Sequence, residues 1–582
     1  MNDFIIASEP LTSLQKTGLD LIVNSKSYQI WGKTEDFKRI DELVIFIRGY
    51  VLPRHDKMIS MLNFKSYELI AKLYKKYGQN FINHLKGSFI ILLVVDDKII
   101  LYNDIHSLEK YFIRNSGGKL IISSNVLLMN TVHRLELDPL YPAVLALFQH
   151  PVSGLTMFRD LSYSEYATEF TFDGEVKIKK YWSPEKLIEA GRDKYSMNDL
   201  IDLFRNIIGD YIDFFRPETV SLTLTGGRDT RSVLAALLYL NIIPHSFTFG
   251  NPYGTDVITA KNICSNLNLP FSNHYIKDID EKIYESLING ILFFGDPLVS
   301  LHRAHRLDAI KKEHEEKEKS DMLFVGAMGG DFIKGVSFND YIVTEFIRLY
   351  LFSKKDTKSL IKEILSKHYV KYDENILNKL TELTISLKFL NRQDFKRSEF
   401  LLAHSFIGAL HDSQDLFIFS RYFNHVVSPF LDIDFFEALF QSRFSLFDNF
   451  RSSKNPLLKI KGGEFQANLI KCLFKPLAYL PMANNYKPID LLRSKYIYAL
   501  KRFYLRIKHP GTVPTFSYDN WFQKYIKSAY LTLSSEIHSF YNLDKLIYEV
   551  NNSNHQTTEG YWHKYSNPVI ISKWLEIIKS NN

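Results

Sequence analysis

The chain has 582 residues, 46% of them hydrophobic and 24% charged, a composition typical of folded globular proteins. This length exceeds what one hydrophobic core serves, so we expect about two to four domains. The net charge of +7 is small for such a chain and does not indicate nucleic-acid binding. Two cysteines, Cys264 and Cys472, are too few for a disulfide framework or a structural zinc site, which favours a cytoplasmic location. No secretory signal is expected, and the longest apolar run, 89–95, is too short to cross a bilayer.

Residues 1 to about 190 are rich in predicted strands. Apolar runs bounded by turn residues cover 43–47, 88–95, 99–102 and 119–123. Between the first two runs, residues 67–77 have helical periodicity and are followed by Gly78, which suits a helix C-cap. The pattern predicts an α+β sandwich over 1–190.

The segment 220–238 reads as an apolar strand, a turn with two glycines and an amphipathic helix. Gly226 and Gly227 allow backbone N–H groups to approach an anion at the positive end of the helix dipole. Hydroxyl donors stand around them, at Thr225, Thr230 and Ser232. Asp229 would repel a phosphate unless a divalent cation, for which Mg²⁺ is the natural choice, lies between them. Neither a Gly-Lys-Ser/Thr loop nor a GxGxxG loop is present.

Alternating elements surround this loop. A helix is predicted from about 195 to 215, a strand at 244–250, a helix at 256–267 and a strand at 273–276. A further apolar strand at 322–325 leads into Gly329, Gly330 and Asp331. This alternation predicts a doubly wound parallel sheet, with ligands at the carboxyl ends of its strands. Residues 340–425 are helical in pattern, and the charge run 311–319 predicts a solvated helix face.

Three of these motifs resemble the asparagine synthetase-like enzymes. The loop 225–230 resembles their Ser-Gly-Gly-x-Asp-Ser pyrophosphatase loop, with threonine in place of each serine. Residues 327–332 resemble their Gly-x-Gly-x-Asp-Glu loop, with Ala327 for the first glycine and Phe332 for the glutamate. Residues 429–432 are identical to their Pro-Phe-Leu-Asp motif, in which we interpret Asp432 first as a helix N-cap.

The resemblance implies a site for ATP and Mg²⁺. The loop 225–232 would hold pyrophosphate, Asp229 and Asp331 would bind the metal, and the backbone from Thr248 to Gly250 would lie beside the adenine. A lysine is needed against the charge of the leaving pyrophosphate. Lys487, in a Leu-Pro-containing segment similar to one in the family, is our choice, and Lys454 is the reserve.

The front segment resembles the glutaminase domain of the same family, an N-terminal-nucleophile fold. The resemblance rests on 77–89, 102–104 and 123–125. That domain uses the thiol of a cysteine exposed after removal of the first methionine, but this chain has Asn2 there. An amide is no nucleophile, so glutamine hydrolysis by that mechanism is excluded and the domain is expected to be a relic. Relatives with the same loss, β-lactam synthetases and lasso-peptide cyclases, use an amine already present on the substrate.

The sequence therefore predicts two domains, a degenerate amidotransferase-like one at 1–190 and an ATP-pyrophosphatase-like one at 191–582, helical from roughly 340 onwards. The expected reaction is adenylation of a carboxylate, followed by displacement of AMP by an amine. Asparagine synthesis from free ammonia and a non-catalytic binding subunit remain the alternatives. The expected partners are a small-molecule or peptide substrate, and a partner protein or a second copy of the chain. The segment 491–508 has the pattern of a basic amphipathic helix, which indicates a solvated face. Binding of an acidic peptide or of a membrane surface by this helix is the alternative.

Overall fold

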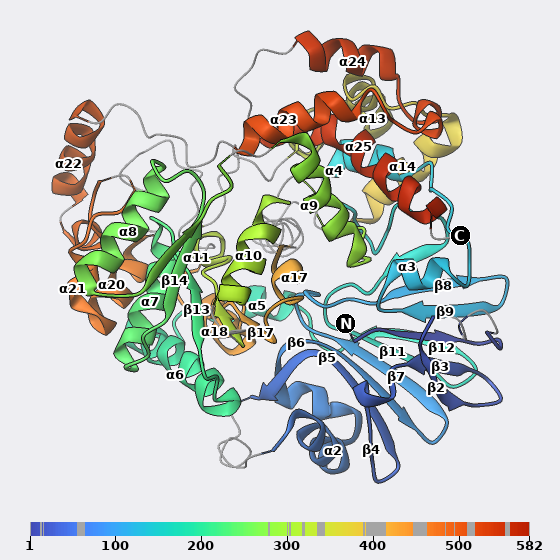
Figure 1. Cartoon of the computed structure of the whole chain (residues 1–582), viewed down its shortest axis with the longest axis horizontal. Helices are drawn as coiled ribbons and strands as arrows, with labels where there is room; N and C mark the ends of the chain where they lie inside the picture. The colour runs from blue at the N-terminus through green and yellow to red at the C-terminus, as the bar shows by residue number, and fades with distance from the viewer. Residues whose placement is uncertain are drawn as a thin grey trace.

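The computed structural model describes residues 2–11, 14, 17–54, 64–277, 280–299, 301, 304–316, 321–334, 344–387, 390, 415–445, 463–483, 485–493, 495–508, 518–552 and 559–580. In these ranges the chain forms two six-stranded antiparallel sheets and one five-stranded parallel sheet, with helices around them (Figure 1). The antiparallel sheets come from the first part of the chain and the parallel sheet from the later part. The predicted mixed α/β fold class is confirmed.

The two antiparallel sheets pack face to face. The first has the order β10 (Leu161–Tyr163), β8 (Phe112–Ser116), β9 (Lys119–Ser123), β1 (Phe4–Ala7), β3 (Gln29–Gly32) and β2 (Asp20–Asn24). The second has the order β12 (Val176–Lys180), β11 (Thr168–Phe172), β7 (Lys98–Asn103), β6 (Leu85–Val95), β5 (Leu43–Pro53) and β4 (Phe37–Ile40). The four apolar runs singled out in the sequence fall in β5, β6, β7 and β9.

The long strand β6 shows why its sequence is continuously apolar. Because side chains alternate along a strand, Ile90 and Leu92 face the first sheet, whereas Ile91 and Leu93 face the helix α2 (Ser66–Tyr77). Both faces of the second sheet are therefore buried in this region. The helix α2 ends where predicted, at Gly78 with a φ of 57°.

The parallel sheet has the order β15 (Phe271–His274), β14 (His245–Phe249), β13 (Val220–Thr223), β16 (Met322–Phe324) and β17 (His425–Val427). From β13 the chain first builds outward through β14 and β15, and then returns to the other side of β13 with β16 and β17. The strand order thus reverses between β13 and β16. In open α/β sheets this reversal creates a crevice at the carboxyl ends of the two strands.

Helices cover the sheets and fill the upper part of Figure 1. They are α3 (Val126–Asn130), α4 (Tyr141–Phe148), α5 (Glu185–Glu189), α6 (Met197–Phe215), α7 (Arg228–Tyr239), α8 (Thr255–Leu267), α9 (Glu281–Phe293), α10 (His305–Glu316), α11 (Gly329–Lys334), α12 (Glu345–Phe352), α13 (Thr357–Lys367), α14 (Glu374–Ser386), α17 (Asp415–Phe419), α18 (Ile433–Phe440), α20 (Glu464–Leu473), α21 (Lys475–Ala478), α22 (Lys495–Lys508), α23 (Tyr518–Ala529), α24 (Leu543–Asn552) and α25 (Glu559–Ser580). Among these described elements, no helix has both the length and the apolar character needed to span a membrane.

The last helix packs against the front part of the chain as well as the later part. The Asn130 side chain donates to the Ile578 carbonyl over 3.0 Å, and the rings of Phe158 and Trp574 lie 6.1 Å apart. In Figure 1, α4 lies among the C-terminal helices α23 and α25. The C-terminal stretch therefore contacts both the front part and the later part of the chain.

Buried ion pairs join the front sheets to α18. Arg54 contacts Asp434 at 2.9 Å and Glu437 at 2.8 Å. The Lys86 Nζ atom, with no exposed side-chain area, lies 3.3 Å from carboxylate oxygens of Asp432 and Asp434. Burial alone would lower the pKa of Lys86, but these carboxylates outweigh it and raise the pKa. Asp432 is also the N-cap of α18, as predicted, since it accepts the Asp434 N–H over 3.0 Å.

The charge run at 311–319 is more than a solvated face. Glu313, in α10, is fully buried. Its carboxylate accepts a hydrogen bond from the Ser221 hydroxyl over 2.8 Å and lies 2.6 Å from a ring nitrogen of His245 and 2.9 Å from one of His274. It therefore ties α10 to three adjacent strands of the parallel sheet. Residues 317–319 of the run lie outside the described residues.

Candidate functional site

The turn after β13 connects the central strand directly to α7. The Leu224 N–H continues the sheet by donating to the Phe247 carbonyl. The Thr225 N–H donates to the Thr230 hydroxyl over 3.2 Å. The Gly227 N–H donates to the Thr225 hydroxyl, also over 3.2 Å. Gly227 is the N-cap of α7 and supplies no side-chain cap. The first N–H groups of this twelve-residue helix are therefore left without a side-chain cap, in a geometry suited to an anion.

The loop after β16 packs directly on the start of α7. A Cβ atom placed on Gly326 would lie 2.5 Å from the Thr230 nitrogen and 2.8 Å from the Asp229 carbonyl carbon. Only a glycine permits this approach. The glycine loop at 225–230 and the loop that leads into 327–332 thus meet at the reversal of the strand order.

The segment 428–432, which contains the Pro-Phe-Leu-Asp motif, supports the loop at 327–332. The Ser428 hydroxyl donates to the Ala327 carbonyl over 2.8 Å, and a Cβ atom on Gly329 would lie 2.6 Å from the Phe430 ring. Between them, Met328 has a φ of 66°, a left-handed conformation that costs energy in a residue with a side chain. Packing against Phe430 holds this turn in place at the start of α11.

Two polar side chains at the loop were not recognised in the sequence. The Gln466 amide, from α20, donates to the Asp229 carboxylate, and Asp256, from the first turn of α8, accepts the Gly226 N–H over 3.0 Å. Asp256 lies six residues after Gly250, the predicted end of a neighbouring strand. An acidic residue just after a strand of the same sheet could therefore have indicated a place for Asp256 at the site. Gln466 lies more than 230 residues from Asp229 and carries no local signal.

A buried arginine holds the predicted lysine segment against the loop. Arg231, fully buried in α7, donates to the carbonyls of Leu480, over 2.9 Å, and Pro481. Burial lowers the pKa of Arg231 to about 10. Next along the chain, the Ala483 N–H bonds to the Gly226 carbonyl over 3.3 Å. The turn that ends at Lys487 is thereby fixed beside the glycine loop.

The remaining predicted site residues occupy different positions. Thr248 is buried in β14, and the carbonyl of Gly250, just beyond that strand, accepts the Asn273 side chain over 3.3 Å. Ser232 lies inside α7, where its buried hydroxyl donates to the Arg228 carbonyl over 2.9 Å. Gly330 lies in the first turn of α11. The Asp331 side chain and Lys454 lie outside the described residues.

Phe332 occupies a core position rather than a pocket. It is fully buried, and its ring centroid lies 4.9 Å from that of Phe436 in α18. Its ring contributes to aromatic packing between α11 and α18.

A cavity of about 690 Å³ lies between the front sheets and the parallel-sheet part. Asn2 is part of its wall, together with Arg48, Glu109 and Arg421. Glu109 lies 3.0 Å from Arg48 and 3.3 Å from Arg421. Burial opposes ionisation of Glu109, but the nearby cations outweigh it and lower its pKa. Among the described residues that line this cavity there is no cysteine, so no thiol stands beside Asn2.

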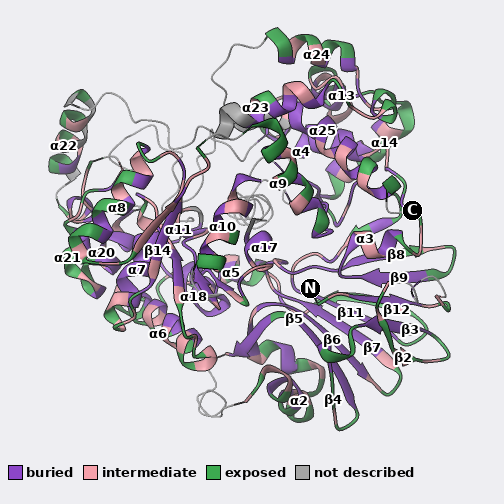
Figure 2. Cartoon of the chain, in the orientation of Figure 1, coloured by how far each residue is buried: buried purple, intermediate pink, exposed green. Residues whose placement is uncertain are grey.

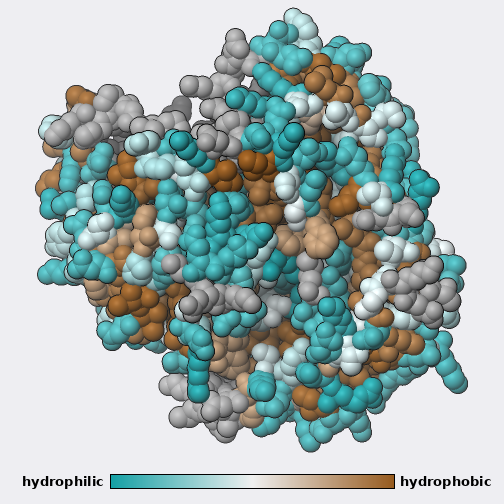
Figure 3. Space-filling view, in the orientation of Figure 1, coloured by the Kyte–Doolittle hydropathy of each residue, from teal (hydrophilic) through white to brown (hydrophobic). Residues whose placement is uncertain are grey.

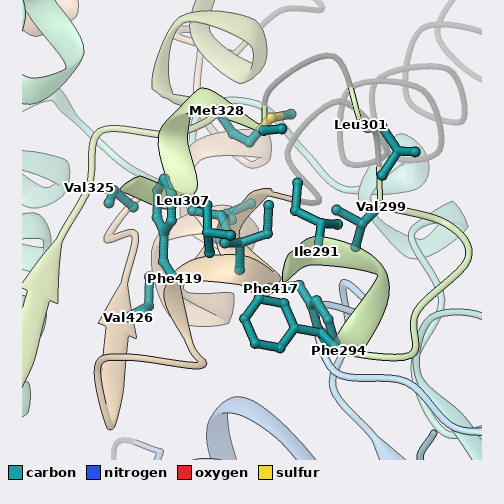
Figure 4. Close-up of a cluster of buried hydrophobic side chains, with 14 of the residues drawn as sticks. Ile291, Phe294, Val299, Leu301, Leu307, Val325, Met328, Phe417, Phe419 and Val426 are labelled. Atoms are coloured by element: carbon teal, nitrogen blue, oxygen red, sulfur yellow. The ribbon is translucent and has the colours of Figure 1, made fainter. Parts of the chain in front are cut away.

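An apolar cluster connects this cavity to the loop after β16. Phe294, Phe417 and Val426 line the cavity and are buried in the same cluster as Val325 and Met328 (Figure 4). The loop after β16 therefore packs on side chains that also form part of the cavity wall.

Comparisons with known proteins give little further information. No protein-family model matches the chain, and no curated protein matches it. Among solved structures, a glutamine phosphoribosylpyrophosphate amidotransferase from B. subtilis, complexed with ADP and GMP, is 10% identical with a TM-score of 0.21. A structure titled as the allosteric regulatory enzyme of purine biosynthesis is 11% identical with a TM-score of 0.22. Each match covers 62% of this chain and 82% of the other. TM-scores this low do not show a shared overall fold.

Proposed function

We propose that the chain is an ATP-dependent, AMP-forming amide ligase of the asparagine synthetase type, with an amidotransferase-like domain at 1–190 and a synthetase-like domain at 191–582. The observation that carries this proposal is the meeting of the separate motifs. Gly326 packs on the backbone of Asp229 and Thr230, and Phe430 packs on Gly329. Segments separated by about 100 residues each are thus assembled at the crevice where such sheets bind ligands.

In this proposal the chain mainly positions the substrates and stabilises charge. The start of α7 and the hydroxyls of Thr225 and Thr230 hold the pyrophosphate, and the backbone from Thr248 to Gly250 lies beside the adenine. Lys487, on the turn held beside Gly226, offsets the charge of the leaving group.

The residues at the loop suit a magnesium ion that also binds phosphate oxygens. Asp229 and Asp256 bring two carboxylates beside Gly226, and Mg²⁺ prefers one or two carboxylates together with phosphates. Among the described residues no group of three metal-binding side chains occurs. Asp331 is proposed as a further ligand. The bound ion would neutralise phosphate charge.

The amine is proposed to come from the substrate or from free ammonia. Asn2 lines the cavity between the two parts and offers only an amide. The acceptor is proposed to be the carboxylate of a small molecule or peptide.

One observation favours a second candidate, a non-catalytic binding subunit. The Asp256 carboxylate already accepts the Gly226 N–H, a donor that pyrophosphate would need. Catalysis requires Asp256 to release this bond or to share a cation with the phosphate.

The test is ATP–pyrophosphate exchange with the full chain and Mg²⁺, using aspartate, other small carboxylic acids and carboxylate-bearing peptides as acceptors. Asp229→Ala is expected to abolish exchange while the circular dichroism spectrum is unchanged. The matched control is Asp544→Ala, which removes an exposed first-turn aspartate from the distant helix α24. Exchange retained by Asp229→Ala would overturn the metal assignment. ATP binding without exchange for any acceptor would favour the non-catalytic candidate.

A further inference from the structure

The helix α22 packs on the protein through one side only. Tyr498 is 4% exposed, and its ring centroid lies 5.5 Å from that of Tyr486. Ala467 and Leu491 complete this small apolar cluster. Nearby, Lys501 pairs with the buried Asp490. In Figure 1, α22 stands at the upper left, away from the rest of the molecule.

The opposite side of α22 exposes an apolar stripe. The exposed fractions are 73% for Tyr496, 52% for Ile497, 70% for Leu500, 66% for Phe503 and 66% for Ile507. At the spacing of an α-helix these positions fall within an arc of roughly 120°, whereas Tyr498 falls on the other side. Figure 2 shows exposed residues along α22, and hydrophobic residues reach the surface at the upper left of Figure 3, as they do at other places on the visible face.

This stripe is contiguous, unlike the scattered apolar residues of ordinary surfaces. Large apolar side chains gathered on one helix face mark an interaction site, because water is an unfavourable environment for all of them. Tyr498 already anchors the helix to the protein, so the stripe is not needed for folding of α22 onto the body. Its side chains are largely exposed, so their apolar area is available to a partner.

The charge of the segment indicates what that partner is. Residues 491–508 include six basic residues and no acidic one, namely Arg493, Lys495, Lys501, Arg502, Arg506 and Lys508. Helical spacing places those within α22 on both sides of the apolar stripe. A second copy of the same stripe would bring like charges together, whereas an anionic surface would be attracted to them. Aromatic residues within an apolar face bordered by basic residues are typical of helices that lie in a lipid interface.

We propose that α22 binds the surface of a membrane containing anionic lipids, lying in the plane of the interface with Leu500 and Phe503 inserted at the boundary of the acyl chains. The fourteen-residue helix is then a peripheral attachment rather than a membrane-spanning segment. The attachment orients the parallel-sheet part, from which α22 extends, towards the lipid surface. This proposal does not depend on the ligase reaction.

The experiment is vesicle flotation of the full chain with phosphatidylcholine alone and with phosphatidylglycerol added. Binding is expected only to the anionic vesicles and is expected to weaken with salt. The double variant Leu500→Gln/Phe503→Gln should lower vesicle affinity by about 100-fold or more, because each buried apolar side chain contributes at least roughly tenfold. Its melting temperature should be unchanged, since both residues are exposed.

The matched control is Ile385→Gln/Leu531→Gln, which removes two large apolar side chains that are 66% and 82% exposed on other elements. This control should bind vesicles as the parent does. Absence of binding to anionic vesicles, or equal binding to both vesicle types, would overturn the proposal. Light scattering that shows a dimer lost only in Leu500→Gln/Phe503→Gln would overturn it in favour of a second copy. Binding of the chain to an acidic peptide but not to vesicles would overturn the proposal in favour of a protein partner.

Discussion

The approach of the β16 loop to α7 can be tested by adding one methyl group at Gly326. In Gly326→Ala the new Cβ atom would lie 2.5 Å from the Thr230 nitrogen and 2.8 Å from the Asp229 carbonyl carbon, closer than the 3.0 Å that real Cβ atoms respect. Both neighbours are backbone atoms, so no side-chain rotation relieves the clash. The loop and the helix must separate by roughly half an ångström to one ångström. Overpacking of this kind costs about 1–3 kcal/mol.

The displacement should affect the proposed nucleotide site more than its size suggests. A misplacement of about 1 Å in a positioned site lowers activity by about 100-fold. We therefore expect urea unfolding to show a loss of about 1–3 kcal/mol and titration calorimetry to show weaker binding of Mg-ATP. Gly191→Ala is the matched control, because its Cβ would meet no atom within 4 Å. Equal stability and equal ATP affinity in the two variants would refute the close approach of the loops.

Two further predictions concern buried charges. Burial raises the pKa of Glu313, but hydrogen bonds from His245, His274 and Ser221 outweigh this and lower the pKa from 4.5 to about 2. The ionised Glu313 carboxylate therefore stabilises the fold fully above pH 4.5, and this stabilisation is lost as the pH falls towards 2. Glu313→Gln should therefore cost up to about 3 kcal/mol in urea unfolding at pH 7 and flatten the pH dependence of stability between pH 4.5 and 2; an unchanged acid profile would contradict this. Lys86→Met should cost about 3–5 kcal/mol at pH 7, because it leaves the carboxylate of Asp432 buried without a cation and leaves Asp434 with Arg54 alone. Burial already raises the pKa of Asp432 and Lys86 opposes this, so without Lys86 the pKa of Asp432 rises further and the loss should shrink at acidic pH; an equal loss at pH 5 and pH 8 would argue against buried charge as the cause.

The elements that the sequence predicted well are those determined by local patterns. The strand β13, the glycine turn and α7 follow from an apolar run, two glycines and a helical repeat, all within twenty residues. The helix α6 begins at a capping box between Ser196 and Asp199 that is fully local. The short strand β15 lies two residues earlier than predicted, at Phe271–His274, because pairing with β14 rather than propensity sets its limits.

The contacts that the sequence could not predict are those between distant segments. Gln466 reaches Asp229, and Arg231 reaches Leu480, only because α20 and the turn after α21 fold back on α7. In the sequence, Glu313 is one of several acidic residues in a charge run, and only the packing of α10 against the parallel sheet shows that it is buried and hydrogen-bonded. The exposure of Leu500 and Phe503 was likewise hidden, since an amphipathic pattern does not reveal which face of a helix packs on the protein.

The buried salt links between the front sheets and α18 limit how the chain can change in evolution. A gene that lost the segment up to residue 190 would leave Asp432, Asp434 and Glu437 without Lys86 and Arg54, and would uncover the apolar face beside them. The front part therefore has a role as a partner in folding, whether or not it has any chemistry of its own. Sequence change there is expected to retain the two basic side chains that neutralise α18.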